Sequence, residues 1–569
     1  MSHKSSDLEL IIRKHVLKNA FDFGKASAGS VVGKVIGEHM DSKKDMKNTM
    51  TLINSEISRV SKLSKEEIEN EMKNFTYAEK KEEVKKSITL TDAVEGNVVT
   101  RFPPEPSGYP HIGHAKAAWI DYEGAKNHGG KMILRFDDTN PEKESYQYVE
   151  AIKEGLIWLG ISWDGKETYT SDNMPKIYEA AEKLIQNDKA YVCFCKQEEI
   201  SKGRTEGVGC KCRSNKIEEN RENWKKMINS EISEGEAILR YKGDMESLNT
   251  VMRDPTIARI LEAKHYRQLT KYRVWPGYDL AVVVMDHLEG ITHSMRSKEY
   301  ELRDELYRAL FEDLKFKKPI QIGFSRLNIK NAPISKRLLL PLVKEGKVLG
   351  WDDPRLPTLK GLERRGILPQ AIKEFVLSFG LSKVESEPSW EALLIINKKM
   401  LDPVSDHYFF VEKPVEVFVE DMKESHIEIK RNPKKDESGS RKIKIGKKIF
   451  LAHSDAKNLK EGEIIRLKDL CNIEIVKIEK TRIVAKAKED KQVEKKVQWV
   501  SEDSEKCTVM IPKDLLDENG EFDQKSLEIT EGRCERSVLE VQKGQVIQFE
   551  RFGFCKLDNK EKLEFIFCC

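Results

Sequence analysis

The chain has 569 residues, of which 34% are charged and 39% hydrophobic, and its formal net charge is only +3. This length predicts about three or four domains. Because cations are barely in excess, any nucleic-acid surface must be a local patch. The longest apolar runs, such as residues 281–285, are far too short to span a bilayer, and the N-terminus lacks the apolar segment of a signal peptide. We therefore expect a cytoplasmic protein that does not enter a membrane.

Helical periodicity marks the first part of the chain. Apolar residues recur at helical spacing in residues 8–17 and again in 50–60, with Glu and Lys between them. A charged stretch at 79–86 then leads to β-branched residues and a proline cluster. This pattern predicts a small N-terminal helical domain over residues 1–95.

The middle and the end of the chain differ in texture. Between about 100 and 350, short apolar segments that we expect to be strands, at 131–137 and 278–285, alternate with helical ones such as 146–159. This alternation predicts a parallel α/β sheet in a domain spanning 96–395. From about residue 402, short alternating segments are separated by Gly, Asn and Lys turns, which predicts a β-barrel or sandwich over 396–569.

A Pro/Gly-rich turn precedes a histidine pair. The segment Arg101-Phe-Pro-Pro-Glu-Pro-Ser-Gly108 leads to His111-Ile-Gly-His114, which opens a plausible helix. A helix start attracts phosphate, and neutral histidines can donate hydrogen bonds to phosphate oxygens. Taken alone, a His-x-x-His motif is equally consistent with two surface histidines that have no function. Its combination with Ile334-Ser-Lys336-Arg337, which we expect to be a flexible loop carrying a mobile cation, predicts an adenylate-forming ATP site.

Charged residues near expected strand ends are candidates for substrate binding, because open α/β sheets bind ligands at that edge. Arg101 and Arg296 could each grip a carboxylate with two N–H groups, and Asp137 could accept a substrate ammonium group. For each of them the alternative is a surface or inter-strand ion pair, and the pattern alone does not choose.

Four of the ten cysteines form two Cys-x-Cys pairs, Cys193 with Cys195 and Cys210 with Cys212. Four thiolates suit tetrahedral Zn²⁺, which would fasten a loop too small to bury a core. Four protein ligands leave no open coordination position, so such a zinc ion would be structural. Free thiols are the alternative.

A basic strip lies near the start of the all-β region. Residues 430–448 contain nine Lys and Arg against two acids. A phosphate-binding surface for RNA is one interpretation, and a solvated hairpin loop is the other. The candidate RNA-binding residues are Lys430, Arg431, Lys434, Lys435, Arg441 and Lys442.

Further motifs extend these features along the chain. They are Leu134-Arg-Phe-Asp-Asp-Thr-Asn-Pro-Glu142, Tyr278-Asp-Leu-Ala281 with Gly290-Ile-Thr-His293, Ser325-Arg-Leu-Asn328, Gly350-Trp-Asp-Asp-Pro-Arg-Leu-Pro-Thr358, and Arg551-Phe-Gly-Phe554. Together with the ATP motifs they resemble the glutamyl- and glutaminyl-tRNA synthetases of class I. Leu17-Lys-Asn-Ala20 with Gly24-Lys-Ala26 is similar to the N-terminal helical extension of the archaeal-type glutamyl enzymes, so the resemblance covers nearly the whole chain.

The resemblance implies a multidomain α/β plus all-β protein: a Rossmann-type class I catalytic domain, an insert at about 190–260 that binds the tRNA acceptor end, and C-terminal β-barrels that bind the anticodon. It also implies roles for individual residues. His111 and His114 would contact the ATP phosphates, Lys336 would stabilise the departing pyrophosphate, and Ser335 would help to set the lysine's loop. The amino-acid pocket would be shaped by Arg101, Glu105, Asp137, Tyr278 and Arg296. The chain departs from the superfamily pattern Lys-Met-Ser-Lys-Ser, since it has Pro333-Ile-Ser-Lys-Arg337.

Arg296 bears on the choice of amino acid. In the resembling families this position is arginine in glutamyl enzymes and uncharged in bacterial-type glutaminyl enzymes. A buried arginine facing a neutral amide would lack a counter-charge, at a cost of about 3–5 kcal/mol. We therefore expect activation of L-glutamate by ATP with Mg²⁺ and its transfer to tRNA(Glu), with release of AMP and pyrophosphate. The alternatives are a glutaminyl-tRNA synthetase, a glutamyl enzyme that also charges tRNA(Gln), a small-molecule nucleotidyltransferase and a non-catalytic RNA-binding protein. The oligomeric state stays open.

Overall fold

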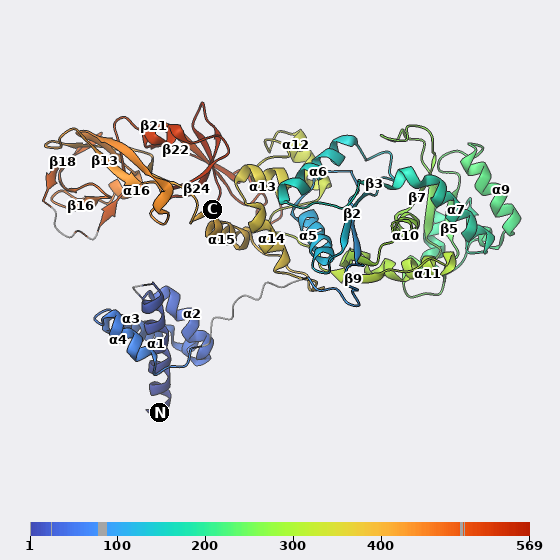
Figure 1. Cartoon of the computed structure of the whole chain (residues 1–569), viewed down its shortest axis with the longest axis horizontal. Coiled ribbons are helices and arrows are strands. Elements are labelled where there is room, and N and C mark those ends of the chain that lie inside the picture. Colours follow the sequence, from blue (N-terminus) through green and yellow to red (C-terminus); the bar gives the residue numbers. More distant parts are fainter. Residues whose placement is uncertain (1, 24–25, 78–87, 490–492, 494) are drawn as a thin grey trace. The chain divides into compact units, whose positions relative to one another are not determined.

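The computed structural model describes residues 2–23, 26–77, 88–489, 493 and 495–569 (Figure 1). The chain divides into two compact units, Met1–Lys85 and Lys86–Cys569. Helices come first, an α/β region follows, and the last third is all-β, so the predicted order of architectures is confirmed. Within the described residues, no helix is both long enough and apolar enough to cross a membrane.

The first unit is a helical bundle. Its helices are α1 (Ser2–Phe23), α2 (Ala28–Glu38), the 3-10 helix η1 (Met40–Asp45), α3 (Met46–Val60) and α4 (Lys65–Met72). Apolar side chains at helical spacing, among them Val16, Val35 and Ile53, meet in its core. Arg13 on α1 forms ion pairs with Glu56 on α3 and Glu71 on α4, which ties three helices together.

A parallel sheet forms the centre of the second unit. Its strands are β1 (Val99–Phe102), β2 (Lys131–Phe136), β3 (Thr168–Tyr169), β8 (His293–Ser297) and β9 (Ile320–Phe324). β1 pairs with β2, β2 with β3, and β8 with β9, all in parallel. The strands form a three-stranded sheet, β1–β2–β3, and a two-stranded sheet, β8–β9. The N–H of Thr292, the residue before β8, donates to the Val99 carbonyl at 3.0 Å, so the two sheets adjoin with β8 beside β1. The resulting order, β3–β2–β1–β8–β9, is the Rossmann order.

Helices cover this sheet and continue beyond it. They are α5 (Ile112–Lys126), α6 (Tyr146–Leu159), α12 (Lys336–Lys344), α13 (Leu359–Arg365), α14 (Pro369–Leu377) and α15 (Trp390–Leu401). The sheet and the apolar faces of α5, α6, α14 and α15 share one core, in which Trp119, Leu134 and Phe375 are buried. The predicted strand at 131–137 and the predicted helix at 146–159 are confirmed as β2 and α6.

Between β3 and β8 the chain builds a second layered region with its own core. Its antiparallel strands are β4 (Ala190–Cys193), β5 (Ile238–Tyr241), β6 (Thr256–Ile260) and β7 (Val274–Pro276). Its α-helices are α7 (Met174–Gln186), α8 (Gln197–Glu206), α9 (Ile217–Ile228) and α10 (Tyr278–Leu288), and α11 (Asp304–Leu314), which follows β8, packs on the same core. The 3-10 turns of this region are η2 (Thr170–Asn173), η3 (Lys211–Ser214) and η4 (Thr250–Met252), and a further 3-10 turn, η5 (Lys298–Arg303), joins β8 to α11.

The predicted strand at 278–285 is wrong, because this segment lies in helix α10. Every residue from Asp279 to Asp286 is buried, so no polar face interrupts the apolar run. A short apolar run of this kind does not distinguish a buried helix from a buried strand. Two acids, Asp286 and Glu289, therefore fall one helical turn apart at the end of α10.

Two near-closed β-barrels form the last third (Figure 1, orange to red). The first contains β12 (Val415–Val419), β15 (Lys448–Leu451), β16 (Ile464–Leu467), β17 (Asn472–Ile478), β18 (Arg482–Lys488), β19 (Lys496–Val497) and β20 (Trp499–Ser501). The second contains β10 (His407–Tyr408), β11 (Phe410–Glu412), β21 (Glu505–Pro512), β22 (Leu527–Cys534), β23 (Val546–Phe549), β24 (Gly553–Asn559) and β25 (Glu564–Phe567). The chain thus forms β10 and β11 of the second barrel, then all strands of the first barrel, and then the remaining strands of the second barrel, β21 to β25. A separate hairpin consists of β13 (Ser425–Lys430) and β14 (Ser440–Ile445).

Candidate functional site

The histidine pair caps a helix that starts at the edge of the sheet. His111 is the N-cap of α5, and its Nδ1 accepts the Gly113 N–H at 3.1 Å. His114 Nδ1 accepts the His111 N–H at 3.2 Å, and the two ring centroids are 4.0 Å apart. Because both Nδ1 atoms act as acceptors, each neutral ring carries its proton on Nε2. The helix start therefore offers two imidazole N–H donors close to one another.

The histidine rings stay neutral at physiological pH. Burial lowers the pKa of His114 to about 4. Burial, with smaller contributions from the charges of His114 and Arg326, lowers the pKa of His111 well below its ordinary value. Neutral rings at the positive end of a helix dipole can bind phosphate as hydrogen-bond donors without bringing two cations together.

The second ATP motif lies against the turn that precedes the histidines. Lys336 begins helix α12, with Ser335 as N-cap, rather than lying in a flexible loop as the sequence suggested. Lys336 Nζ donates to the Ser107 carbonyl and lies 4.5 Å from the ring centroid of Tyr148. A Cβ placed on Gly113 would lie 3.8 Å from Ile334 Cδ1. The two motifs, more than 200 residues apart in sequence, are thus neighbours in space.

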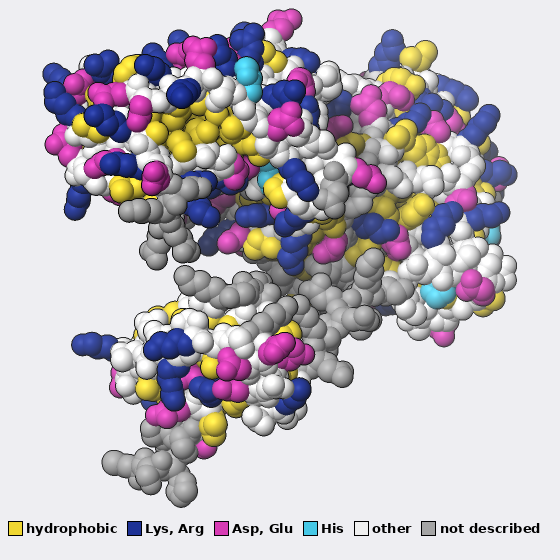
Figure 2. Space-filling model, turned by 60° about the vertical axis from the view of Figure 1, so that its left-hand side comes forward, with side chains coloured by type: hydrophobic (Ala, Val, Ile, Leu, Met, Phe, Trp, Pro, Cys, Tyr) yellow, Lys and Arg dark blue, Asp and Glu magenta, His cyan; other side chains and the backbone are white. Residues whose placement is uncertain are grey.

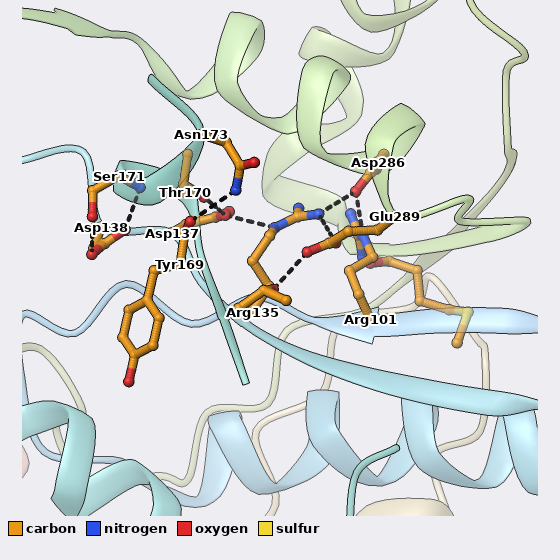
Figure 3. A network of polar contacts seen from close by, with 12 residues as sticks. Arg101, Arg135, Asp137, Asp138, Tyr169, Thr170, Ser171, Asn173, Asp286 and Glu289 are labelled. Atoms are coloured by element: carbon orange, nitrogen blue, oxygen red, sulfur yellow. Dashed lines mark hydrogen bonds and ion pairs between the residues drawn. The ribbon is translucent and has the colours of Figure 1, made fainter. Parts of the chain in front are cut away.

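A buried network of charged side chains joins β1, β2 and α10 (Figure 3). The Asp286 carboxylate accepts Arg101 Nε at 3.0 Å and Arg135 Nη1 at 2.8 Å, and its other oxygen accepts the Tyr307 hydroxyl at 2.8 Å. Arg135 Nη1 also donates to Glu289 at 2.7 Å. Burial alone would raise the pKa of Asp286, but the two arginines hold it below its ordinary value.

Of the predicted pocket residues, Arg101 belongs to this interior network. Its side chain is 1% exposed, and its Nη1 donates to the Met295 carbonyl at 3.0 Å. Arg101 therefore stabilises β8 from the protein interior, and its charge is not exposed to a substrate at the surface. Glu105, by contrast, is exposed in the Pro/Gly-rich turn.

Asp137, the residue after β2, belongs to the same network (Figure 3). Its Oδ1 accepts Arg135 Nε at 2.8 Å and the Thr170 hydroxyl at 2.9 Å. Among the described residues both of these bonds go to Oδ1, so Oδ2 is available for an ammonium group.

Arg296 lies at the end of β8 in a pocket of aromatic rings. Its guanidinium carbon is 5.6, 5.3 and 4.9 Å from the ring centroids of Tyr278, Tyr300 and Tyr307. The side chain is 4% exposed, and its Nη1 donates to Asp304 at 3.0 Å. Its Nε and Nη2 are buried and have no hydrogen-bond partner among the described residues. Two buried N–H groups on a cation are the complement of a carboxylate.

Three acids of this region, Asp286, Glu289 and Asp304, were not among the residues predicted from the sequence. Asp286 carried a usable signal, because an acid that interrupts an apolar run must find a buried partner. No local signal marked Asp304, whose contact with Arg296 depends on the turn between β8 and α11.

The four cysteines of the two Cys-x-Cys pairs come together next to β4. Their sulfur atoms all lie within 4.8 Å of one another, with Cys193 Sγ 3.7 Å from Cys210 Sγ and Cys195 Sγ 3.9 Å from Cys212 Sγ. A tetrahedral site with Zn–S bonds of about 2.3 Å needs sulfurs about 3.8 Å apart. The group could therefore hold a metal ion such as zinc.

The basic strip is less positive in space than in sequence. Arg431, Lys434 and Lys442 pair with Glu540, Asp402 and Glu428, three acids from outside residues 430–448. Figure 2 shows the same mixing over its visible face, where Lys and Arg side chains lie among Asp and Glu.

Arg441 differs from the other residues of the strip. Its side chain is fully buried and forms an ion pair with Glu535 at 2.8 Å. It therefore holds the β13–β14 hairpin to the second barrel and offers no surface to RNA.

Comparison with known proteins gives this architecture a family. Residues 97–403 match the family model described as the catalytic domain of class I tRNA synthetases (E and Q). Residues 405–490 and 496–558 match two models described as the anticodon-binding domain of the same enzymes. The chain belongs to the class I tRNA synthetases for E and Q. Enzymes of this class use ATP, and the anticodon-binding domains bind tRNA.

Archaeal relatives match this class I synthetase over nearly its whole length. It is 43% identical to the glutamate–tRNA ligase of Nitrosopumilus maritimus, with 97% of this chain and 98% of that protein covered. It is 40% identical to that of Cenarchaeum symbiosum, with 98% and 99% covered. It is 38% identical to that of Pyrococcus furiosus, with 98% of each covered.

The lowered pKa of His114 predicts a pH-dependent contribution to stability. The unfolded chain binds a proton on this residue near pH 6.5, whereas the folded chain does so only near pH 4. The contribution is therefore complete above pH 6.5 and is lost as the pH falls toward 4. We expect the difference in thermal unfolding midpoint between the wild type and His114→Gln to narrow between pH 7 and pH 4.5. A difference that stays constant would contradict the assignment, and the exposed His426→Gln controls for the substitution itself.

Proposed function

We propose that the protein is a glutamate–tRNA ligase that forms glutamyl-adenylate from L-glutamate and ATP and transfers the glutamyl group to the 3′ end of tRNA(Glu). The observation that carries the choice of amino acid concerns buried Arg296, whose Nε and Nη2 have no hydrogen-bond partner in the part of the chain that the structure describes. The glutamate side-chain carboxylate can accept both and supply the missing negative charge. The names of the full-length relatives agree with this choice.

The amino-acid end of the pocket requires two opposite charges. Arg296 would take the γ-carboxylate, and Tyr278, whose ring adjoins the guanidinium, would wall the side chain. Asp137 Oδ2 would accept the α-ammonium group. Glu105, exposed in the neighbouring turn, would border the entrance. A glutamine side chain would leave Arg296 without its counter-charge, and sites built around a polar partner can reject the wrong analogue by about 10⁴- to 10⁵-fold.

In the first step an oxygen of the glutamate α-carboxylate bonds to the α-phosphorus of ATP, which is bound as its Mg²⁺ complex. The bond from that phosphorus to the pyrophosphate oxygen breaks, and pyrophosphate leaves with the electron pair. His111 and His114 would donate Nε2–H hydrogen bonds to the phosphates, and Lys336 would neutralise charge on the leaving group. No protein nucleophile is needed, so positioning and charge stabilisation supply the catalysis.

In the second step a hydroxyl of the terminal tRNA adenosine, expected to be the 2′-OH, attacks the carbonyl of the adenylate. The bond between the carbonyl carbon and the phosphate oxygen breaks, AMP leaves with the electron pair, its phosphate takes up the hydroxyl proton, and glutamyl-tRNA forms. On the all-β region, exposed lysines of the basic strip such as Lys430 and Lys435 would contact tRNA phosphates, together with Arg431, Lys434 and Lys442. Buried Arg441 is left out of this contact.

The cysteine group would hold a structural zinc ion. When bound, zinc would cross-link the segment after β4 to the turn at η3, and its four thiolate ligands would leave no position for substrate. Tyr191 and Arg240 approach Cys210 Sγ, each at 3.6 Å, and would orient and neutralise the thiolates from outside.

Lys336→Ala should lower turnover in glutamate-dependent pyrophosphate exchange by about 100- to 1,000-fold, because it removes a donor that meets charge formed during the reaction. KM for glutamate should change little, since Lys336 contacts the turn at Ser107 rather than the pocket of Arg296. Lys344→Ala, an exposed lysine at the other end of α12, is the matched control. Unchanged turnover in Lys336→Ala would exclude Lys336 from the reaction.

Arg296→Gln should raise KM for glutamate by about 10- to 100-fold, because a hydrogen bond to a charged group contributes about 1.5–3 kcal/mol. The wild type should activate glutamate in strong preference to glutamine, and the variant should lose most of that preference. Pyrophosphate exchange with each amino acid, in the presence of tRNA, measures both values. The exposed Arg308→Gln on α11 is the control. A wild type that prefers glutamine would overturn the proposed function.

Metal analysis of the purified protein should find one zinc ion per chain. Cys195→Ser combined with Cys212→Ser removes two of four ligands, so zinc content and thermal stability should both fall. Cys471→Ser, in the first barrel and outside the group, should retain zinc. A metal-free wild type of full thermal stability would show that the four thiols do not form a zinc site.

A further inference from the structure

The guanidinium group of Arg296 has two edges that can each meet a carboxylate. One edge presents Nη1 and Nη2, and the other presents Nε and Nη2. Asp304 Oδ1 accepts a hydrogen bond at 3.0 Å from Nη1, the nitrogen that takes no part in the second edge. The second edge, Nε with Nη2, is buried and has no partner among the described residues. Asp304 therefore determines which edge of Arg296 faces the pocket.

Asp304 is itself held in place. It is the first residue of α11, where the helix dipole favours a carboxylate. Its Oδ1 also accepts Gln321 Nε2 from β9 at 3.1 Å. The carboxylate is thus fixed by a helix end and by the neighbouring strand, and its side chain is only 27% exposed.

The aromatic rings restrict Arg296 in a different way. The guanidinium carbon lies 4.9–5.6 Å from the ring centroids of Tyr278, Tyr300 and Tyr307. Aromatic rings attract the cation without regard to which of its N–H groups points where. The rings shield the guanidinium group from water but do not fix the direction of its N–H groups. Asp304 provides a directional contact, the hydrogen bond from Nη1.

This orientation matters for the choice between a carboxylate and an amide. A carboxylate accepts from both Nε–H and Nη2–H at once. An amide in the same place can accept from only one of them, and its NH₂ group then faces a second donor. That mismatch exists only while the edge is fixed. A guanidinium free to turn could offer a single N–H to the amide oxygen and move the other away.

We propose that Asp304 is a specificity-determining positioning residue: by holding Nη1 of Arg296, it presents the Nε/Nη2 edge to the substrate side chain and makes the pocket select a carboxylate over an amide. This inference rests on the proposed function, since it assumes that Arg296 receives the substrate side chain. Asp304 acts through Arg296 and does not touch the substrate.

The test uses the full chain and compares pyrophosphate exchange with glutamate and with glutamine. Asp304→Ala should raise KM for glutamate about 10-fold and lower the glutamate/glutamine ratio of kcat/KM by at least as much, because Arg296 is no longer oriented. KM for ATP should not change. Asp304→Asn keeps an oxygen in reach of Nη1 and should retain most of the preference. Glu301→Ala removes an exposed carboxylate from the same turn, one that pairs with Lys383 and not with Arg296, and should match the wild type.

Asp304→Ser, which keeps a polar group at the helix start but does not reach Arg296, gives a second measurement if the alanine variant is unstable. Loss of preference in the alanine or serine variant, with retention in Asp304→Asn, supports the assignment. An unchanged preference in the alanine or serine variant overturns it and leaves the proposed function intact. A KM for ATP that rises as much as KM for glutamate also overturns it, since that result indicates general damage. A wild type without preference for glutamate overturns both proposals.

Discussion

The site depends on one buried carboxylate, that of Asp286. It receives Arg101 from β1, Arg135 from β2 and Tyr307 from α11, all within 3.0 Å. Removing one partner of a buried ion pair costs about 3–5 kcal/mol, because the other charge is left uncompensated. The strands β1 and β2 come before the antiparallel strands β4 to β7 in sequence, and the helices α10 and α11 come after them. The Asp286 carboxylate thus joins the segments of the catalytic domain that lie before and after β4 to β7 in sequence.

The interior ion pairs also hold the strand that carries Arg296. Arg101 Nη1 donates to the carbonyl of Met295, the residue before Arg296. The network therefore holds the middle of β8 at Met295, and β1 holds the residue before β8, Thr292, through hydrogen bonds with Val99. The chain adds the strands β1, β2 and β3 toward one side, and then adds β8 and β9 on the other side of β1. The strand order therefore reverses between β1 and β8, and open α/β sheets bind their ligands at such a point. Arg296 lies near the end of β8, where its Nη1 donates to Asp304.

Local rules predicted much of this molecule from its sequence, and long-range pairing explains what they missed. The start of α5 at the histidine motif, strand β2, helix α6 and the change to an all-β texture all follow from spacing and turn residues. The burial of Arg101 and Arg441 does not, because their partners Asp286 and Glu535 lie 185 and 94 residues away in sequence. The basic strip looked strongly cationic for the same reason, since acids outside residues 430–448 supply its counter-charges.

The two ends of the site therefore depend on different kinds of information. At the start of α5, each position of His111-Ile-Gly-His114 has a local reason. His111 caps the helix, Ile112 is fully buried, and His114 returns a hydrogen bond to the cap. A Cβ on Gly113 would lie 2.9 Å from His111 Cε1, so only glycine leaves the ring in place. By contrast, Arg296 on β8 donates to Asp304 on α11, so its surroundings are built by contacts between elements. A short sequence motif does not contain such contacts, and for this reason the surroundings of Arg296 could not be predicted locally whereas the start of α5 could.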